Sequence, residues 1–212
     1  MARPVFLDVD NTLLNNDAAK GELASRIAGA VSDRVAARFW DLYERVRDEQ
    51  DYVDFPATVT RLRAEHPADA ARIERILDEL PFRDFVYPGA RETIARLWDT
   101  TTPVILSDGD PVFQRRKIER AGLAAAVRGN VLIYVHKERR LADVARRFPG
   151  PGPVFVDDKA RILGHVERQL PDAVTVHVRQ GSYASEPPDA GDPQPDVVID
   201  HIAELVPAIA RI

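Results

Sequence analysis

The chain has 212 residues, of which 45% are hydrophobic and 30% charged, and its formal net charge is −5 at pH 7. A chain of this length can bury one main hydrophobic core and a smaller second one. The acidic balance, with both signs interspersed, argues against a nucleic-acid partner or an acidic membrane partner. Because the chain has no cysteine, disulfides, thiolate catalysis and zinc sites with Cys ligands are excluded.

No stretch approaches the roughly 18 consecutive apolar residues that a membrane-spanning helix needs. The chain also enters a predicted strand directly, without the charged and apolar regions of a secretion signal. We therefore expect a cytoplasmic protein that has no membrane partner.

The first predicted element is a buried strand in the short apolar run at residues 5–9. Asp8 and Asp10 fall where this strand must end, and they point the same way because side chains alternate along a strand. Open α/β folds bind ligands at the carboxyl ends of their strands, so the two carboxylates predict a site. The simpler alternative is that they only cap a turn, together with Asn11 and Thr12.

Residues 17–80 show helical periodicity, with apolar residues spaced by threes and fours. Pro56 and Pro67 each suit a first helical turn, so about four helices are expected. Aromatic residues at helical spacing usually form a core, and that is our interpretation of the aromatic cluster in this region. The alternative is a substrate lid. The cluster comprises Phe39, Trp40, Tyr43, Tyr52 and Phe55.

The remaining chain alternates between predicted helices and strands. The expected elements are helix 91–98, strand 103–107, helix 111–121, strand 131–135, a basic helix ending near 148, strand 154–156, helix 160–170, strand 174–178 and helix 202–209. This alternation predicts an α/β fold with a parallel sheet and right-handed crossovers. The stretch 182–196, rich in Pro, Asp and Gly, is predicted to be a long loop, either mobile or packed near a site.

Polar residues follow four of the predicted strands at the point where each one ends. They are Asp8 with Asp10, Ser107 with Asp108-Gly109-Asp110, Lys137, and Asp157 with Asp158. These strand ends share one edge of a parallel sheet, so residues about 150 positions apart can converge on one pocket. Clustered carboxylates need a cation to offset their repulsion, and Mg²⁺ is the natural choice. The five histidines, which lack metal-ligand spacing, are interpreted as surface or structural residues: His66, His136, His165, His177 and His201.

The pentapeptide Asp8-Val9-Asp10-Asn11-Thr12 resembles the DxDxT signature of the haloacid dehalogenase (HAD) superfamily. The other strand-end residues follow in the order of that family's motifs, so the resemblance covers nearly the whole chain. The stretches QRRKIERAGL (114–123) and DVVIDHIAEL (196–205) also resemble the family. The resemblance implies a Rossmann-like core, residues 1–14 and 88–212, with an inserted all-helical cap domain, residues 15–87.

The resemblance also implies roles for the carboxylates. Asp8 is expected to be the nucleophile, which forms an aspartyl phosphate, and Asp10 the general acid and base. Asp8 and Asp158 are the expected side-chain ligands of Mg²⁺, and Asp10 contributes its backbone carbonyl. Asp157 ranks second as a ligand, because many relatives have Gly at that position.

Donors for the transferring phosphoryl group are expected from the ends of the second and third strands. The predicted phosphate-binding residues are Ser107, Asp108, Gly109 and Lys137, of which Ser107 and Lys137 are also counted as catalytic. Lys137 is further expected to neutralise Asp8. Lys159 is an alternative to Lys137, since it follows the carboxylates and could pair with them. Lys117 is another, but it is predicted to lie on a solvated helix face with Arg115, Arg116 and Arg120 rather than on an RNA-binding surface.

The predicted function is an Mg²⁺-dependent phosphatase that acts on a small phosphorylated metabolite. Asp10 favours this branch, because the family's dehalogenases lack an Asp at that position. A phosphomutase would need the same residues. A HAD-fold protein that binds a ligand or partner without turnover is the other alternative, and three unusual features leave room for it: Asp157, the acidic Asp108-Gly109-Asp110, and the missing Pro after Lys137. Oligomeric state is not predicted.

Overall fold

The structure is a computed structural model that describes residues 2–186, 190–191 and 193–212. At its centre lies a six-stranded sheet in the order β3-β2-β1-β4-β5-β6, in which neighbouring strands all pair in parallel. The strands are β1 (Arg3–Leu7), β2 (Thr101–Asp108), β3 (Val131–Tyr134), β4 (Val154–Asp157), β5 (Val174–Val178) and β6 (Val197–Ile199). The predicted α/β, Rossmann-like fold is therefore confirmed.

The edge strand β6 was not expected from the sequence. It has only three residues and follows the Pro- and Asp-rich stretch 182–196, of which residues 187–189 and 192 lie outside the described part of the chain. Asp196, just before the strand, accepts a hydrogen bond from the backbone N–H of Thr175 at 2.9 Å. This contact places β6 against β5.

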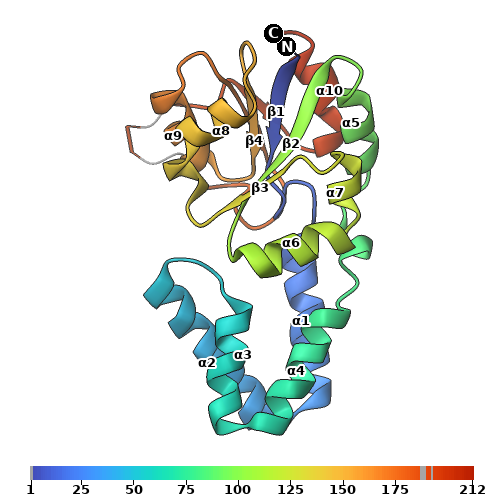
Figure 1. The fold of residues 1–212 in the computed structure, drawn as a ribbon, viewed down its shortest axis with the longest axis vertical. Helices are drawn as coiled ribbons and strands as arrows, with labels where there is room; N and C mark the ends of the chain where they lie inside the picture. Colours follow the sequence, from blue (N-terminus) through green and yellow to red (C-terminus); the bar gives the residue numbers. More distant parts are fainter. Residues whose placement is uncertain (1, 187–189, 192) are drawn as a thin grey trace.

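Both faces of the sheet are covered by helices, so its strands read as continuous apolar runs. Phe6 and Phe155 pack with α8 (Leu141–Arg147) and α9 (Ala160–Gln169) on one face. Val5 and Leu7 pack on the other, where α5 (Ala90–Leu97) and α10 (Leu205–Ile209) lie (Figure 1). The remaining helices of this part are α6 (Pro111–Arg120), α7 (Leu123–Ala126) and the short 3₁₀ helices η1 (Phe82–Phe85), η2 (Lys137–Arg139) and η3 (Ile202–Glu204).

Four helices between β1 and β2 form a bundle beyond α6, at the end toward which the strands point (Figure 1). They are α1 (Asn16–Ala30), α2 (Asp33–Gln50), α3 (Phe55–Glu65) and α4 (Pro67–Glu79). Pro56 and Pro67 lie in the first turns of α3 and α4, as predicted, and the side chain of Asp54 caps α3 by accepting from Ala57 N–H at 2.7 Å. The division into two domains at 14/15 and 87/88 stays a prediction.

Two segments join the bundle to the sheet, and they pair with each other. Leu14 and Val86 form an isolated antiparallel bridge. Asn15 N–H donates to the Phe85 carbonyl at 2.8 Å, and Tyr87 N–H donates to the Leu13 carbonyl at 3.0 Å. The bundle is therefore held at the carboxyl edge of the sheet by a short two-stranded connection.

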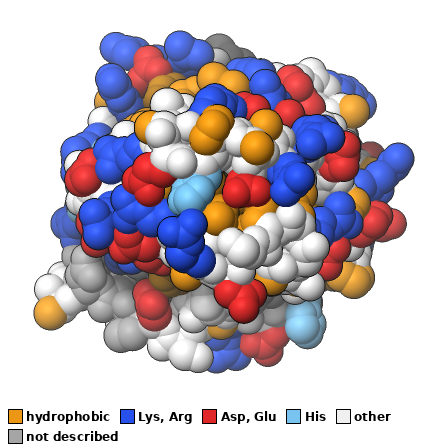
Figure 2. Space-filling view, turned by 90° about the horizontal axis from the view of Figure 1, so that it is seen from below, with side chains coloured by type: hydrophobic (Ala, Val, Ile, Leu, Met, Phe, Trp, Pro, Cys, Tyr) orange, Lys and Arg blue, Asp and Glu red, His pale blue; other side chains and the backbone are white. Residues whose placement is uncertain are grey.

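The surface of the bundle end carries both signs of charge. Figure 2, which views this end, shows Lys and Arg side chains interspersed with Asp and Glu. Some of them are paired across helices, as in Arg38–Glu65 and Arg61–Glu49. No helix in the described ranges is both long and apolar enough to cross a membrane.

Phe39 forms the centre of the bundle core: it is fully buried and its ring lies 5.1 Å from that of Trp40 and 6.5 Å from that of Phe55. We expect Phe39→Ala to lower the free energy of unfolding by about 3–5 kcal/mol, because it leaves a cavity. Chemical denaturation measures this change. Val198→Ala, at a half-exposed position of β6, is the control and should change it by less than about 0.5 kcal/mol. An equal loss in both variants would contradict this account of the core.

Candidate active site

The most enclosed part of the site is an ion cluster around Lys137. This lysine opens η2 directly after β3, and it is 3% exposed. Its Nζ donates to Oδ1 of Asp8 at 2.5 Å, lies 2.7 Å from Oδ2 of Asp157, and donates to the Leu106 carbonyl at 3.3 Å. Burial alone lowers the pKa of Lys137, but the carboxylates of Asp157 and Asp8 outweigh it and hold that pKa well above its ordinary value. Lys137 thus pairs with both Asp8 and Asp157, and its role in neutralising Asp8 during a reaction stays a prediction.

The register of the sheet brings these residues together. Leu7 pairs with Val156, so Asp8 and Asp157 fall side by side one position beyond that pair. The backbone N–H of Asp8 donates to the Val156 carbonyl at 2.9 Å, which continues the ladder past the end of β1. Residues far apart in the sequence therefore meet at one sheet edge.

Asp158 completes a group of three buried carboxylates. One carboxylate oxygen from each of Asp8, Asp157 and Asp158 lies within 4.8 Å of the others. Both side-chain oxygens of Asp158 are buried and have no hydrogen-bond partner among the described residues. Burial, and next the negative charges of Asp157 and Asp8, raise the pKa of Asp158 to about 9. Burial also raises the pKa of Asp8 to about 7, against the opposing effect of Lys137.

This arrangement fits a hard divalent cation. Unpartnered buried carboxylate oxygens are costly, and a cation of the Mg²⁺ type satisfies them with oxygen ligands. Asp8 and Asp158 line the cavity and are the better candidates. Asp157 is already engaged, because its Oδ1 accepts from Lys159 N–H at 3.0 Å and its Oδ2 faces Lys137. The ranking of Asp157 behind Asp158 agrees with these contacts.

Asp10 lies apart from this cluster, in a polar network of its own. Its carboxylate forms an ion pair with Lys117 and accepts from Nε2 of Gln114 at 3.0 Å. The same Nε2 lies 3.1 Å from Ser107 Oγ and 2.7 Å from the Asp108 carbonyl. Gln114 therefore joins the ends of β1 and β2 and fixes the direction of the Asp10 carboxylate.

The prediction that Lys117 lies on a solvated helix face is wrong. Lys117 is 3% exposed, and Gln114 is 5% exposed. A sequence signal for this was present: Gln114 and Lys117 stand at helical spacing with the buried Ile118 and Ala121, so all four share one face of α6. The charged run concealed that stripe, because its arginines do face solvent.

Three of the four predicted phosphate-binding residues lie at the end of β2, close to Asp10, and the fourth, Lys137, follows β3. Ser107 is 1% exposed and lines the cavity, as do Asp108 and Gly109. Two groups are already engaged within the protein: Asp108 Oδ1 accepts from Lys137 N–H at 2.7 Å, and Gly109 N–H donates to the Tyr134 carbonyl at 3.1 Å. The phosphate contacts of Ser107, Asp108, Gly109 and Lys137 stay predictions.

The helical bundle and the segment after β5 both reach the site. Asn11 has a left-handed backbone (φ 59°), and its Oδ1 accepts from the N–H groups of Asn16 and Asp17 at the start of α1. Ser182 N–H in turn donates to Asp17 Oδ2 at 2.7 Å. Gly181 (φ 71°) packs so closely on the Asn11 side chain that a Cβ atom at this position would clash with it. The described start of the loop therefore packs near the site, one of the two predicted possibilities.

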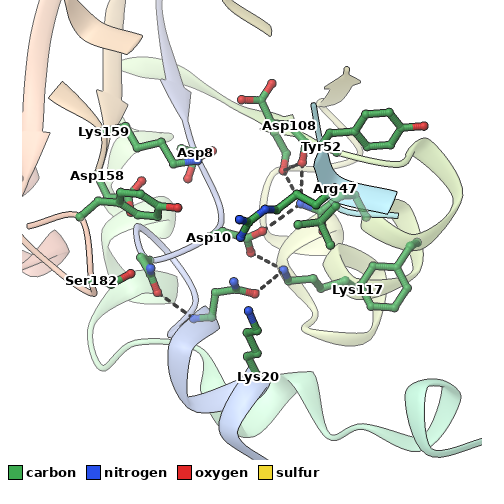
Figure 3. A pocket seen from close by; sticks show the side chains of 18 of the residues that line it. Asp8, Asp10, Lys20, Arg47, Tyr52, Asp108, Lys117, Asp158, Lys159 and Ser182 are labelled. Atoms are coloured by element: carbon green, nitrogen blue, oxygen red, sulfur yellow. Dashed lines mark hydrogen bonds and ion pairs between the residues drawn. The ribbon is translucent and has the colours of Figure 1, made fainter. Parts of the chain in front are cut away.

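Between the sheet edge and the bundle lies a cavity of about 1050 Å³. Figure 3 shows Asp8, Asp158 and Lys159 on one side of it and Lys117 on the other, with Asp10 between them. Tyr43, Tyr52 and Phe55 line the bundle side, whereas Phe39 is buried in the bundle core. The aromatic cluster thus serves partly as core and partly as cavity wall. Arg47 and Lys20 also line the cavity from the bundle, and Lys20 was not expected from the sequence.

Comparison with known proteins identifies the family. No protein-family model matches the chain, and no curated protein matches it. A solved structure from Burkholderia xenovorans LB400, described as a haloacid dehalogenase-like hydrolase, is 39% identical with a TM-score of 0.90, and the match covers 100% of this chain and 98% of that one. The chain therefore belongs to the haloacid dehalogenase-like hydrolases.

Two further structures share the fold at lower identity. A HAD hydrolase from Bacillus subtilis, bound to magnesium, is 18% identical with a TM-score of 0.63, over 100% of this chain and 99% of that one. L-2-haloacid dehalogenase from Xanthobacter autotrophicus, with chloropropionic acid covalently bound, is 16% identical with a TM-score of 0.65, over 99% of both chains. At these identities the two structures show the shared fold alone.

The buried carboxylates predict a pH-dependent stability in the metal-free protein. The pKa values of Asp8 and Asp158 are raised from 3.8 to about 7 and about 9, so the folded chain holds these protons more tightly than the unfolded chain. Their stabilisation is fully present below the ordinary pKa and is lost as pH rises through the two folded values. In EDTA, Tm should therefore fall by several degrees between about pH 5 and about pH 9.

Asp158→Asn should flatten this dependence, because it removes the carboxylate with the larger shift, and Mg²⁺ should raise the wild-type Tm more at high pH than at low pH. Asp200→Asn, at an exposed carboxylate, is the control and should keep the wild-type slope. Thermal unfolding across a pH series measures all three. A slope that survives in Asp158→Asn would show that the buried cluster is not its source.

Proposed function

We propose that this protein is a phosphatase that hydrolyses the phosphate ester of a small metabolite, with Mg²⁺ as cofactor. Asp8 is the nucleophile, and Asp10 is the general acid and base. The observation that carries the proposal is the separation of the two carboxylates into different environments. Asp8 belongs to the buried cluster with Lys137, whereas Asp10 lies on the cavity wall with Lys117 and Gln114. Two carboxylates set apart in this way suit two different tasks.

In the first step, Asp8 attacks phosphorus. Lys137 binds Oδ1, so Oδ2 is the attacking atom; the new Asp8–phosphorus bond forms as the bond between phosphorus and the leaving oxygen breaks. Lys137 lowers the repulsion between the carboxylate and the phosphate dianion. The Ser107 hydroxyl supplies a further donor to the phosphoryl oxygens. Bound Mg²⁺, held by Asp8, Asp158 and the Asp10 carbonyl, would neutralise charge on the phosphoryl group.

Asp10 serves both steps by moving one proton. Asp10 enters the first step in its protonated form and gives that proton to the leaving alkoxide, which leaves the carboxylate that pairs with Lys117. The carboxylate then takes a proton from the water that attacks the aspartyl phosphate and regenerates Asp8. Gln114 and Lys117 hold its carboxylate in one orientation through both steps. Because Gln114 also contacts Ser107, this orientation is coupled to the end of β2, where the phosphoryl oxygens would lie.

Phosphoryl transfer accounts for the site better than dehalogenation does. A departing halide needs no proton, so a dehalogenase has no use for Asp10 as a general acid. The unpartnered oxygens of Asp158 likewise have no role without a cation. The magnesium-bound relative from Bacillus subtilis supports Mg²⁺ as the cofactor. A phosphomutase remains the alternative that uses the same residues, and release of free phosphate separates it from a hydrolase.

Asp8→Asn should lower kcat for phosphate esters at least about a thousandfold, because it removes the nucleophile. Lys137→Ala should lower it about a hundredfold or more, since Asp8 would then face the phosphate without a counter-charge. The assay is phosphate release in Mg²⁺ from a panel of sugar and glycerol phosphates. EDTA should abolish the wild-type activity, and added Mg²⁺ should restore it.

Asp99→Asn, at an exposed position remote from the cavity, controls for the removal of a carboxylate, and circular dichroism checks that Lys137→Ala is folded. If Asp8→Asn, prepared free of host phosphatase, turned over like the wild type, the aspartyl-phosphate mechanism would be excluded. The same panel should include 2-chloropropionate, and chloride release without phosphate release would identify a dehalogenase.

Asp10→Asn separates general acid from general base catalysis. 4-Nitrophenolate leaves without protonation, so this variant should still phosphorylate Asp8 with 4-nitrophenyl phosphate but hydrolyse the intermediate slowly. We expect a burst of one nitrophenolate per enzyme, followed by turnover about 10²–10⁴-fold below the wild type. Glycerol 1-phosphate should give no burst, because its leaving group needs the proton. Stopped-flow absorbance follows the nitrophenolate, and quenched-flow analysis of the released glycerol follows the second ester, because phosphate stays on Asp8 in the first step. Equal loss on both esters without a burst would assign Asp10 a different role.

A further inference from the structure

We propose that Lys20, on α1, forms a second anion-binding subsite in the cavity, which recognises an acidic group at the far end of the substrate from the transferred phosphoryl group. The inference rests on the proposed function and narrows its substrate to a phosphate ester with a second anionic group, a carboxylate or another phosphate. Lys20 lines the cavity from the bundle side and is exposed to it (Figure 3).

The positive charge of Lys20 is not cancelled by the protein. It makes no ion pair with any residue of the described ranges, although Asp17 precedes it by three positions on the same helix, at the spacing of a helical ion pair. The oxygens of Asp17 are taken up elsewhere: Oδ2 accepts from Ser182 N–H at 2.7 Å, and Oδ1 lies 3.2 Å from Ser182 Oγ. The carboxylate best placed to neutralise Lys20 is thus turned toward the loop after β5.

Two aromatic rings hold the ammonium group instead. Lys20 Nζ lies 4.6 Å from the ring centroid of Tyr43 and 5.7 Å from that of Trp40. A cation on an aromatic face is positioned and partly desolvated, but its charge remains available to an anion. Tyr43 is 4% exposed and Trp40 packs on Phe39, so these rings are fixed by the bundle core. The result is an oriented ammonium group in a partly enclosed space.

The position of Lys20 sets the distance to the reacting centre. Asn16 Oδ1, at the start of α1, accepts from Lys117 Nζ at 2.8 Å, and Lys117 pairs with Asp10. Lys20 lies four residues further along the helix, a rise of about 6 Å. A second acidic group that meets Lys20 would therefore lie a few bonds from the phosphorus atom, within a single small metabolite.

The lysine usage of the chain points to the same role. Only four of its 29 basic residues are lysines. Lys117, Lys137 and Lys159 all lie at the ends of the strands or on α6 beside Asp8 and Asp10, and Lys20 is the fourth. A lysine presents a compact point charge, whereas an arginine presents a planar fork, so the two are not interchangeable at an anion site. Ordinary surface positions of this chain carry arginine.

The Lys20 side of the cavity suits an anion better than the end of α2 does. Arg47 also enters the cavity, but its guanidinium lies 2.9 Å from Glu44 and 3.9 Å from Asp48. Asp48 and Asp51 line the cavity there as well, and their charges repel an acidic group. The subsite is therefore assigned to Lys20 and not to Arg47.

Matched pairs of phosphate esters test the subsite by hydrolysis. The pairs are 3-phosphoglycerate with glycerol 1-phosphate, 6-phosphogluconate with glucose 6-phosphate, and fructose 1,6-bisphosphate with fructose 6-phosphate. The wild type should favour the acidic member of at least one pair by about tenfold or more in kcat/KM. Lys20→Met should lower that ratio about ten- to a hundredfold, and Lys20→Arg should restore part of it. Arg45→Met, at an exposed arginine of α2 outside the cavity lining, should keep the wild-type ratio.

Calorimetric titration of the same esters into Asp8→Asn protein tests the subsite without turnover. The acidic member should bind more tightly, and Lys20→Met in the same background should remove the difference. Hydrolysis with no preference in any pair, or a ratio unchanged in Lys20→Met, would overturn the subsite while leaving the phosphatase in place. A Lys20-dependent binding preference without hydrolysis would keep the subsite and contradict the proposed reaction.

Discussion

Three aspartates that share one buried corner of the sheet are the constraint on which the rest of the site depends. Their oxygens lie within 4.8 Å of one another, and a single ammonium group, from Lys137, offsets part of their charge. The oxygens of Asp158 have no described partner, and its pKa, raised to about 9, means that this carboxyl group keeps its proton at neutral pH in the metal-free protein. Gathering these carboxyl groups in a buried place lowers the stability of the fold. A bound cation would recover that free energy, because it stabilises their charged forms. The same cluster that lowers stability therefore holds Asp8 next to the positive charges that would offset a phosphate dianion.

The sequence predicted the sheet and its active edge because both follow from local patterns. Strands buried on two faces are short apolar runs, and the residue that follows each run lies at the carboxyl edge in any parallel sheet. Asp8, Lys137 and Asp158 could be placed in this way without knowledge of the strand order. Pro56 and Pro67 marked helix starts for an equally local reason, since proline fits only the first turn.

Other parts of the site depend on contacts that no local pattern encodes. The helical spacing of Lys117 with Ile118 indicates that it is buried, but only the docking of α6 over the end of β1 shows that it pairs with Asp10. The role proposed for Lys20 can be inferred only from the contact between Asp17 and Ser182, because that contact turns the Asp17 carboxylate away from Lys20. Ser182 lies far from both residues in the sequence. The strand β6 is too short for alternation to reveal, and it depends on Asp196 bonding across to Thr175. Long-range partners, not residue types, decided these cases.

The uneven use of the two basic amino acids has a practical consequence for chemical labelling. Arginine covers the outside of the molecule in ion pairs such as Arg38–Glu65, while lysine is confined to the region around the cavity. Lys117 and Lys137 are 3% exposed, so among the side-chain amines an acylating reagent meets Lys20 far more readily than these two. Tags, cross-linkers and resins that react with side-chain amines modify most proteins at scattered surface sites, but here they would act mainly on the lining of the cavity.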